Sequence, residues 1–230
     1  MINNDRVLAV IPARMGSKRL KNKNLLPLGG KPLISWTIET TKKSKFIDDI
    51  IVTSDDKSIL CLAEKMNVEY IKRPKNLATD KTDIFPVIKH VLSLCEENYK
   101  YVILCQPTSP LRTYKDIDNA FKSLIYNKAD AIISVSETIK SPLWSAKLPK
   151  NLDMSDFVKK ITLSKRSQDL PKYFTPNGAI YICKISSLLL SKTFYINENI
   201  YAYIMPKHRS VDIDDKFDFL YANSLIDKTL

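Results

Sequence analysis

The sequence predicts an α/β protein built on a doubly wound, largely parallel sheet, with one excursion over residues 138–175. Short apolar runs alternate with helical stripes throughout residues 6–136, which indicates successive βαβ units. From residue 138 the chain carries scattered prolines and mixed charges without a clear period, and a strand pattern returns at residue 179. Because 230 residues suit one sizeable domain, we expect residues 1–230 to form a single unit that carries this excursion.

The predicted elements begin with an apolar strand at 7–11, which Pro12 ends because proline has no N–H to donate to a neighbouring strand. There follow a helix over 33–41, a strand over 50–53, a helix that Asp55 caps and that runs to 66, a strand over 68–71, a helix over 84–95, a strand over 101–105, a helix over 117–125 and a strand over 131–135. After the excursion we expect a strand over 179–183, a helix over 185–190, a strand over 202–205 and a helix over 216–226. The last helix is predicted to turn four side chains toward the core: Phe217, Leu220, Tyr221 and Leu225.

Composition excludes several classes of protein. The net charge of +11 comes from 36 Lys and Arg residues spread along the whole chain, which favours anionic ligands in general over a nucleic-acid partner. The N-terminus lacks the apolar core of a signal peptide and no apolar run approaches ~18 residues, so we expect a cytoplasmic protein without a membrane partner. Two histidines exclude a histidine-rich metal site. Four cysteines without a C-x-x-C pair are expected to be buried free thiols.

The most distinctive stretch is the loop that follows the first strand. It carries five basic residues: Arg14, Lys18, Arg19, Lys21 and Lys23. Ligands of open α/β sheets bind beyond the carboxyl ends of the strands, so a buried strand that leads into a basic loop favours a polyanion site. Gly16 allows a turn in which backbone N–H groups face phosphate oxygens. The loop lacks the paired glycines of a Walker A motif, and charge alone would also fit a solvated basic loop.

Two carboxylates near the end of the chain are candidates for a metal site. Asp212 and Asp214 flank Ile213, so in an extended segment their side chains point the same way. Their spacing suits a hard cation such as Mg²⁺, which takes oxygen ligands together with substrate phosphates. Asp215 would then cap the final helix. The alternative is that all three aspartates only favour the N-terminus of that helix.

Two further segments could read a substrate. Gln106 opens the run Gln-Pro-Thr-Ser-Pro-Leu-Arg directly after a predicted strand, and its amide can both donate and accept hydrogen bonds. The alternative is a proline-stiffened connection in which Thr113 caps the next helix. Arg73 could donate to the carbonyl of a pyrimidine while the backbone near Thr82 reads its amino group. A capping role for Thr82 or Asp83 fits the sequence equally well.

A last group of candidates lies around the strand at 179–183. Asn177 precedes this strand and Tyr181 lies within it. Phe194 and Tyr195 offer aromatic surface of the kind that packs against a sugar face or an N-acetyl methyl group. The alternative is that both aromatic residues belong to the core.

Over residues 7–221 the chain resembles the acylneuraminate (sialic acid) cytidylyltransferases, also called CMP-sialic acid synthetases. The resemblance rests on Pro-Ala-Arg at 12–14, Ser-Lys at 17–18, Lys-Asn at 23–24 and the Gln-Pro-Thr-Ser-Pro-Leu-Arg run at 106–112. It implies a three-layer Rossmann-like nucleotidyltransferase fold and a homodimer in which residues 138–175 mediate dimerisation. It also implies a bacterial enzyme of cell-surface polysaccharide biosynthesis.

The resemblance implies transfer of CMP from CTP to the anomeric hydroxyl of a nine-carbon 2-keto sugar acid, N-acetylneuraminate first, with Mg²⁺ and release of pyrophosphate. The nucleotide would then bind Arg14, Ser17, Lys18, Lys23, Asn24, Arg73 and Thr82. The sugar acid would bind Gln106, Arg166, Asn177, Tyr181, Phe194 and Tyr195. The metal would bind Asp212 and Asp214, which share the catalytic role with Arg14 and Lys23.

Two positions depart from the family's pattern. Members often have an arginine where this chain has Ser167, with Arg166 one residue earlier, and some have a lysine where it has Trp144. Both positions concern recognition of the sugar carboxylate, so legionaminic and pseudaminic acid are alternative substrates and the eight-carbon acid Kdo is a more distant one. A noncatalytic RNA-binding module is the alternative from a different class, and salt-dependent RNA binding without turnover would support it.

Overall fold

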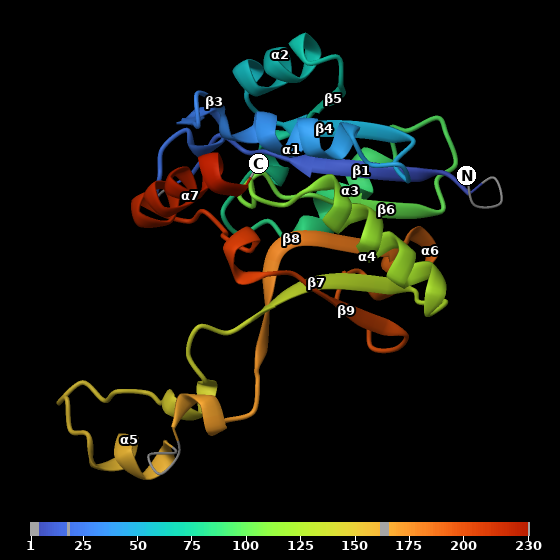
Figure 1. Cartoon of the computed structure of the whole chain (residues 1–230). Helices are drawn as coiled ribbons and strands as arrows, with labels where there is room; N and C mark the ends of the chain where they lie inside the picture. The colour runs from blue at the N-terminus through green and yellow to red at the C-terminus, as the bar shows by residue number, and fades with distance from the viewer. Residues whose placement is uncertain (1–4, 18, 162–165, 230) are drawn as a thin grey trace.

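The computed structural model describes residues 5–17, 19–161 and 166–229, which contain one seven-stranded sheet in the order β5-β4-β1-β6-β8-β7-β9 (Figure 1). Its strands are β1 (Val7–Pro12), β4 (Asp49–Ser54), β5 (Glu69–Lys72), β6 (Tyr101–Leu104), β7 (Ala131–Glu137), β8 (Phe174–Lys184) and β9 (Ile200–Ile204). A separate short hairpin consists of β2 (Pro27–Leu28) and β3 (Lys31–Pro32). Six of the seven sheet strands lie within two residues of their predicted ends, whereas β8 begins five residues before the predicted start at 179, and no apolar run predicts the β2–β3 hairpin.

The direction of β8 differs from that of its neighbours. Strands β5, β4, β1 and β6 are parallel, and β9 is parallel to β7, but β8 is antiparallel to both β6 and β7. Glu137 at the end of β7 pairs with Phe174 at the start of β8, so the excursion forms the long loop of a hairpin. Because of this reversal, the beginning of β8 lies at the edge of the sheet where β1, β4 and β6 end.

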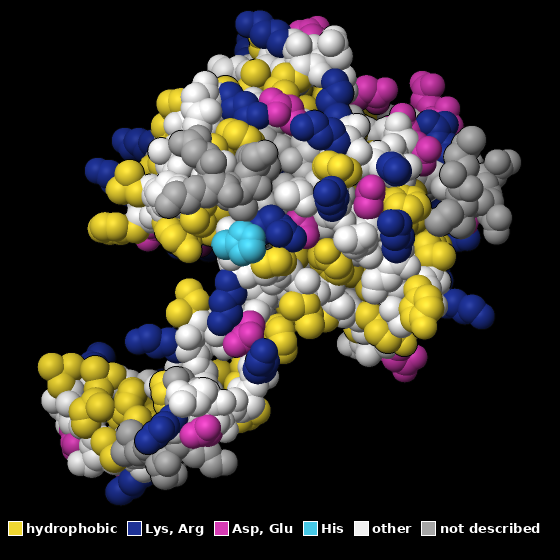
Figure 2. Space-filling model, viewed as in Figure 1, with side chains coloured by type: hydrophobic (Ala, Val, Ile, Leu, Met, Phe, Trp, Pro, Cys, Tyr) yellow, Lys and Arg dark blue, Asp and Glu magenta, His cyan; other side chains and the backbone are white. Residues whose placement is uncertain are grey.

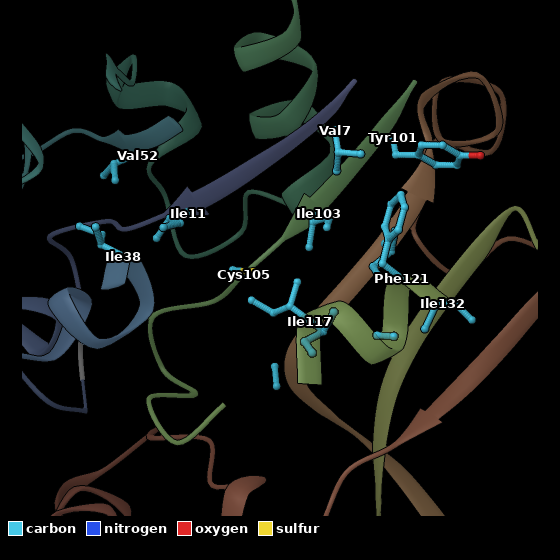
Figure 3. Close-up of a cluster of buried hydrophobic side chains, with 14 of the residues drawn as sticks. Val7, Ile11, Ile38, Val52, Tyr101, Ile103, Cys105, Ile117, Phe121 and Ile132 are labelled. Atoms are coloured by element: carbon cyan, nitrogen blue, oxygen red, sulfur yellow. The ribbon is translucent and has the colours of Figure 1, made fainter. Parts of the chain in front are cut away.

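Helices cover both faces of the sheet and make a three-layer fold. On one face lie α1 (Leu33–Lys42), α2 (Lys57–Lys65) and α4 (Tyr114–Tyr126), and on the other α3 (Ile84–Leu92) and α6 (Ile185–Ser191). Figure 3 shows part of the larger core, in which Ile117 and Phe121 of α4 face Ile103 of β6. The Phe121 ring meets the edge of Tyr101 at 5.3 Å between centroids. Alternate residues of β1 supply the two cores, as expected for a strand buried on both faces.

The final helix, α7 (Lys216–Thr229), is rotated relative to the sequence prediction. Phe217 is 80% exposed, and Leu220 and Tyr221 are also exposed. Ala222 and Ile226 are buried instead, in a small third core with the β2–β3 hairpin, and Leu225 packs partly against it. The prediction for Phe217, Leu220 and Tyr221 was therefore wrong. This helix packs against the β2–β3 hairpin, the start of α1 and the loops that carry Leu111 and Ile213, instead of against the sheet, so its buried stripe is narrow.

The helix caps agree in part with the sequence. Asp215 caps α7 as predicted, since its carboxylate accepts from the backbone N–H groups of Phe217 and Asp218. Asp56, and not Asp55, caps α2. Asp55 instead accepts a hydrogen bond of 3.0 Å from the backbone of Met15, which ties it to the basic loop.

The cysteines are free thiols, but their burial differs from the prediction. Cys105 and Cys183 are buried, Cys95 is half-buried and Cys61 is exposed on the outer face of α2. Among the described residues, no helix combines the length and the apolar character needed to cross a membrane.

The excursion projects away from the sheet (Figure 1). It contains the short helices η3 (Pro142–Trp144), α5 (Ser155–Lys160) and η4 (Ser167–Asp169). Apolar side chains along it are open to solvent, and Figure 2 shows hydrophobic atoms gathered on this part of the surface. The exposed apolar side chains of the excursion include those of Ile139, Leu148, Leu152, Met154 and Val158. The excursion buries few of its own apolar side chains, so it does not form a hydrophobic core by itself.

Candidate functional site

A cavity of about 470 Å³ opens where the segments after β1, β5 and β6 meet the segment that precedes α7. This is the edge that the topology of open α/β sheets reserves for ligands, and the volume is typical of small-molecule sites. Nine residues that the sequence singles out line it: Arg14, Ser17, Lys23, Asn24, Arg73, Thr82, Gln106, Asp212 and Asp214. Lys18 lies outside the described residues.

Two side-chain contacts fix the conformation of the basic loop. The buried Asn24 donates from its side chain to the backbone oxygen of Arg14 at 3.0 Å. The guanidinium of Arg14 forms an ion pair with Asp80, which sequence reasoning assigned no role. Thus Asn24 shapes the loop through the backbone, while Arg14 reaches across the cavity mouth toward the segment that precedes α3.

Arg73 occupies the floor of the site. Its side chain is buried and donates to the backbone oxygen of Thr53 at 2.7 Å. Burial lowers the pKa of Arg73 to about 10, with the nearby charge of Arg14 adding to the effect, so the group stays charged at neutral pH. Thr82 shares a 2.7 Å hydrogen bond with Thr79, and the N-cap position of α3 is Asp83, whose side chain makes no capping hydrogen bond.

The two candidate metal ligands lie on an irregular segment that crosses the cavity. The backbone N–H of Ile213 donates to Thr108 at 2.8 Å, and the ammonium of Lys23 donates to the backbone oxygen of Ile213. Lys23 also lies 3.5 Å from the carboxylate of Asp214. Partial desolvation by the surrounding protein raises the pKa of Asp212, whose side chain faces the cavity, and the charge of Asp214 adds to that rise.

Gly178 lies where two of the candidate ligands, Gln106 and Asp212, come close to each other. It lies at the start of β8 with φ +74°, a conformation that favours glycine. A Cβ atom there would lie 2.9 Å from Oε1 of Gln106 and 3.1 Å from Oδ2 of Asp212. The absence of a side chain thus allows the candidate sugar ligand and the candidate metal ligand to approach the same backbone.

The other predicted sugar ligands do not line this cavity. Asn177 is buried, accepts from Ser134 at 2.6 Å and donates to Ser210 at 2.9 Å. Tyr181, Phe194 and Tyr195 form an aromatic cluster, with the Tyr181 ring centroid 5.8 Å from that of Phe194 and 6.1 Å from that of Tyr195. Phe194 is fully packed in the core and Tyr195 is exposed. Arg166 is exposed on the excursion.

Comparison with known proteins identifies the family. A family model described as cytidylyltransferase matches residues 8–204 of this chain. The chain belongs to the cytidylyltransferase family. It is 37% identical to an N-acylneuraminate cytidylyltransferase of Escherichia coli O18:K1:H7, over 97% of this chain and 52% of that protein. The chain therefore spans about half the length of the first relatives that it matches.

Two further relatives match this chain over nearly their whole length. A CMP-N,N'-diacetyllegionaminic acid synthase of Legionella pneumophila is 32% identical, over 96% of this chain and 97% of that protein. A pseudaminic acid cytidylyltransferase of Campylobacter jejuni is 30% identical, over 95% of both chains. Sequence comparison thus brings together relatives named for three different acids.

Solved structures confirm the fold class of the chain. A CMP:2-keto-3-deoxy-manno-octonic acid synthetase complexed with CTP superposes with a TM-score of 0.74, covering 98% of this chain and all of that one at 15% identity. A 4-diphosphocytidyl-2C-methyl-D-erythritol synthase from Anaerococcus prevotii superposes with a TM-score of 0.68 at 14% identity. At such identities the likeness shows a shared fold alone.

Proposed function

We propose that this chain transfers CMP from CTP to the anomeric hydroxyl of a nine-carbon 2-keto sugar acid, N-acetylneuraminate first, and releases pyrophosphate. The observation that carries the proposal is the convergence of Arg14, Lys23 and Arg73 with Asp212 and Asp214 around one cavity. The relatives named for sialic, legionaminic and pseudaminic acids support the substrate class.

The charges of the cavity suit a nucleoside triphosphate with a divalent cation. Three cationic side chains line the cavity, and so do the carboxylates of Asp212 and Asp214. A bare polyanion would be repelled by those two carboxylates, whereas a divalent cation between phosphate and carboxylate removes the repulsion. The described residues contain no group of three or more histidine, cysteine or acidic side chains placed for a metal. Two carboxylates fit Mg²⁺, which commonly takes one or two of them and completes its shell with water and phosphate oxygens.

The residues of the chain then act by positioning and electrostatics. The anomeric oxygen of the sugar acid bonds to the α-phosphorus of CTP as the bond from that phosphorus to the bridging oxygen breaks, and the hydroxyl proton passes to solvent. Arg14 and Lys23 stabilise the charge that develops on the phosphates, and Asp212 and Asp214 would hold Mg²⁺. When bound there, Mg²⁺ would neutralise phosphate charge and favour deprotonation of the attacking hydroxyl.

We also propose that the excursion mediates dimerisation. Its exposed apolar residues, among them Ile139 at 90% and Leu152 at 69% exposure, gain burial only against another surface. In a two-fold dimer the excursion of one subunit can reach the second, which gives Arg166 a route to the sugar side of the partner's cavity.

Pyrophosphate release tests the proposal. Purified protein is incubated with CTP, Mg²⁺ and, in separate reactions, N-acetylneuraminic acid, legionaminic acid, pseudaminic acid and Kdo. We expect release with one nine-carbon acid, and loss of release when EDTA removes Mg²⁺. Omission of the sugar acid is the control for simple CTP hydrolysis. Folded protein that binds CTP but releases no pyrophosphate with any of the four acids would contradict the proposed reaction.

A further inference from the structure

The segment between β9 and α7 carries both candidate metal ligands, although no strand pairing fixes its position. Residues 205–215 contain only one short turn, η5 (Lys207–Arg209). A non-regular segment depends on individual contacts for its position. Behind Asp212 these contacts include the buried Val211, the hydrogen bond between Ser210 and Asn177, and the ion pair of Arg209. Beyond Asp212, the backbone N–H of Ile213 donates to the backbone oxygen of Thr108 at 2.8 Å.

The partner of Arg209 is Asp116, which is only 1% exposed. Nε and Nη2 of Arg209 donate to the two carboxylate oxygens of Asp116 at 3.1 and 2.8 Å, a bidentate arrangement. The hydroxyl of Tyr203 donates to the same carboxylate at 3.3 Å. Burial alone would raise the pKa of Asp116, but the hydrogen bonds from Arg209 and Thr113 outweigh it and hold the pKa below its usual value.

Asp116 also fixes the segment that carries Gln106. It is the third residue of α4 and forms a capping box with Thr113, whose backbone N–H and hydroxyl donate to its carboxylate at 2.9 and 2.7 Å. Thr113 directly follows the run from Gln106 to Arg112. One buried carboxylate therefore joins the 106–113 loop to the 205–215 segment, and these two segments carry the candidate sugar and metal ligands.

We propose that Asp116 and Arg209 are positioning residues that fix Asp212 and Asp214 relative to the 106–113 loop. Neither residue lines the cavity, so they act through the segments that they hold. The consequence for metal binding rests on the proposed function, whereas the effect on the position of the segment does not. Residues behind the ligands of a metal commonly change affinity or activity about 10- to 100-fold when substituted.

The experiment compares five variants with the wild-type chain: four single substitutions and the double variant Arg209→Gln/Asp116→Asn. Arg209→Gln and Asp116→Asn each break the pair, and Arg209→Lys keeps the charge but loses the bidentate geometry. Arg6→Gln is the matched control, because Arg6 pairs with Asp49 at 2.6 Å just before β1, at the opposite edge of the sheet. Thermal melting of every variant reports whether it is folded.

Hydrogen exchange of the backbone amides is the first readout. We expect exchange in 205–215 to rise about tenfold or more in Arg209→Gln and Asp116→Asn, less in Arg209→Lys, and not at all in Arg6→Gln. The double variant should be no worse than the worse single one, since both remove the same interaction. Unchanged exchange in 205–215 of folded Arg209→Gln would overturn the proposal, whatever reaction the wild-type chain catalyses.

Binding of Mn²⁺ in the presence of CTP, followed by electron paramagnetic resonance without any sugar acid, is the second readout. We expect the affinity of Arg209→Gln for Mn²⁺ to fall about 10- to 100-fold, and that of Arg6→Gln to stay at the wild-type value. Faster exchange with unchanged Mn²⁺ affinity would overturn the link to the metal ligands. A wild-type chain that binds no Mn²⁺ with CTP would instead reject the proposed function, and the exchange result alone would then decide the positioning role.

Discussion

The two sides of the site are built differently. On the nucleotide side, every predicted residue that the structure describes lines one cavity, from Arg14 on the loop after β1 to Thr82 before α3. On the sugar side, only Gln106 does so. Asn177 and Phe194 are buried, and Arg166 is exposed on the excursion.

This difference follows from the topology. The nucleotide side consists of short segments that follow parallel strands, so the sheet brings them to one edge without help from elsewhere. The sugar side depends on β8, which enters the sheet from the excursion, and on the excursion itself. We therefore infer that one chain carries every described residue of the proposed nucleotide side and only part of the proposed sugar side. Variants that separate the two sides test this interpretation.

The largest effect is expected at Asp212, where the two sides meet. Asp212→Asn keeps the shape of the side chain but removes the negative charge that holds a divalent cation. We expect kcat to fall about a thousandfold, equivalent to about 4 kcal/mol in the activation barrier, with an unchanged melting temperature. Turnover is measured by pyrophosphate release over a range of Mg²⁺ concentrations. Wild-type turnover of this variant at limiting Mg²⁺ would remove Asp212 from the metal site.

An intermediate effect is expected at Gly178, which contacts both sides. Gly178→Ala places a Cβ atom within 3.1 Å of the Gln106 and Asp212 side chains and strains the backbone by roughly 1–2 kcal/mol. We expect kcat/KM for the sugar acid to fall about 10- to 100-fold, since small misplacements at a reacting centre are costly. Steady-state kinetics with each substrate varied in turn gives the measurement.

Gly30→Ala is the control for this substitution. Gly30 also has a positive φ, +83°, but nothing lies within 4 Å of the position of its Cβ atom. It should lose a similar amount of stability and keep wild-type kcat/KM. Equal kinetic losses in the two variants would show that backbone strain, and not the contact with Gln106 and Asp212, causes the effect.

Local patterns predict the strands and the nucleotide side well. The apolar run of β1 and the basic residues after it are adjacent in sequence, so one strand end determines where Arg14 and Lys23 lie. The reversal of β8 leaves no such mark, because a buried strand has the same composition in either direction. The prediction of the buried face of α7 was wrong for a related reason: the sequence pattern of the helix does not say whether the sheet or other, smaller elements cover it.

Contacts between residues far apart in the sequence also limit what can be predicted from local patterns. Thr113 and Asp116 carry the spacing of a capping box, so their mutual contact could have been found in the sequence. The pairing of Asp116 with Arg209 joins residues 93 positions apart and has no local signature. In the same way, the close approach of Asp212 to Gly178 arises only when β8 and the segment after β9 meet at the edge of the sheet.

The smallest expected effect, and the most direct test of the comparison, concerns Arg166. If the sugar side is completed by the partner subunit, Arg166→Ala should raise KM for the sugar acid about five- to tenfold, as expected for the loss of one hydrogen bond worth about 1 to 1.4 kcal/mol, and leave KM for CTP unchanged. Mixed dimers of Arg166→Ala and Asp212→Asn subunits distinguish the two routes. If Arg166 acts on the site of the partner subunit, each mixed dimer contains one site in which both side chains are intact. The wild-type KM then returns, at up to half the wild-type kcat. A residue that acts within its own subunit leaves no intact site, and the raised KM persists.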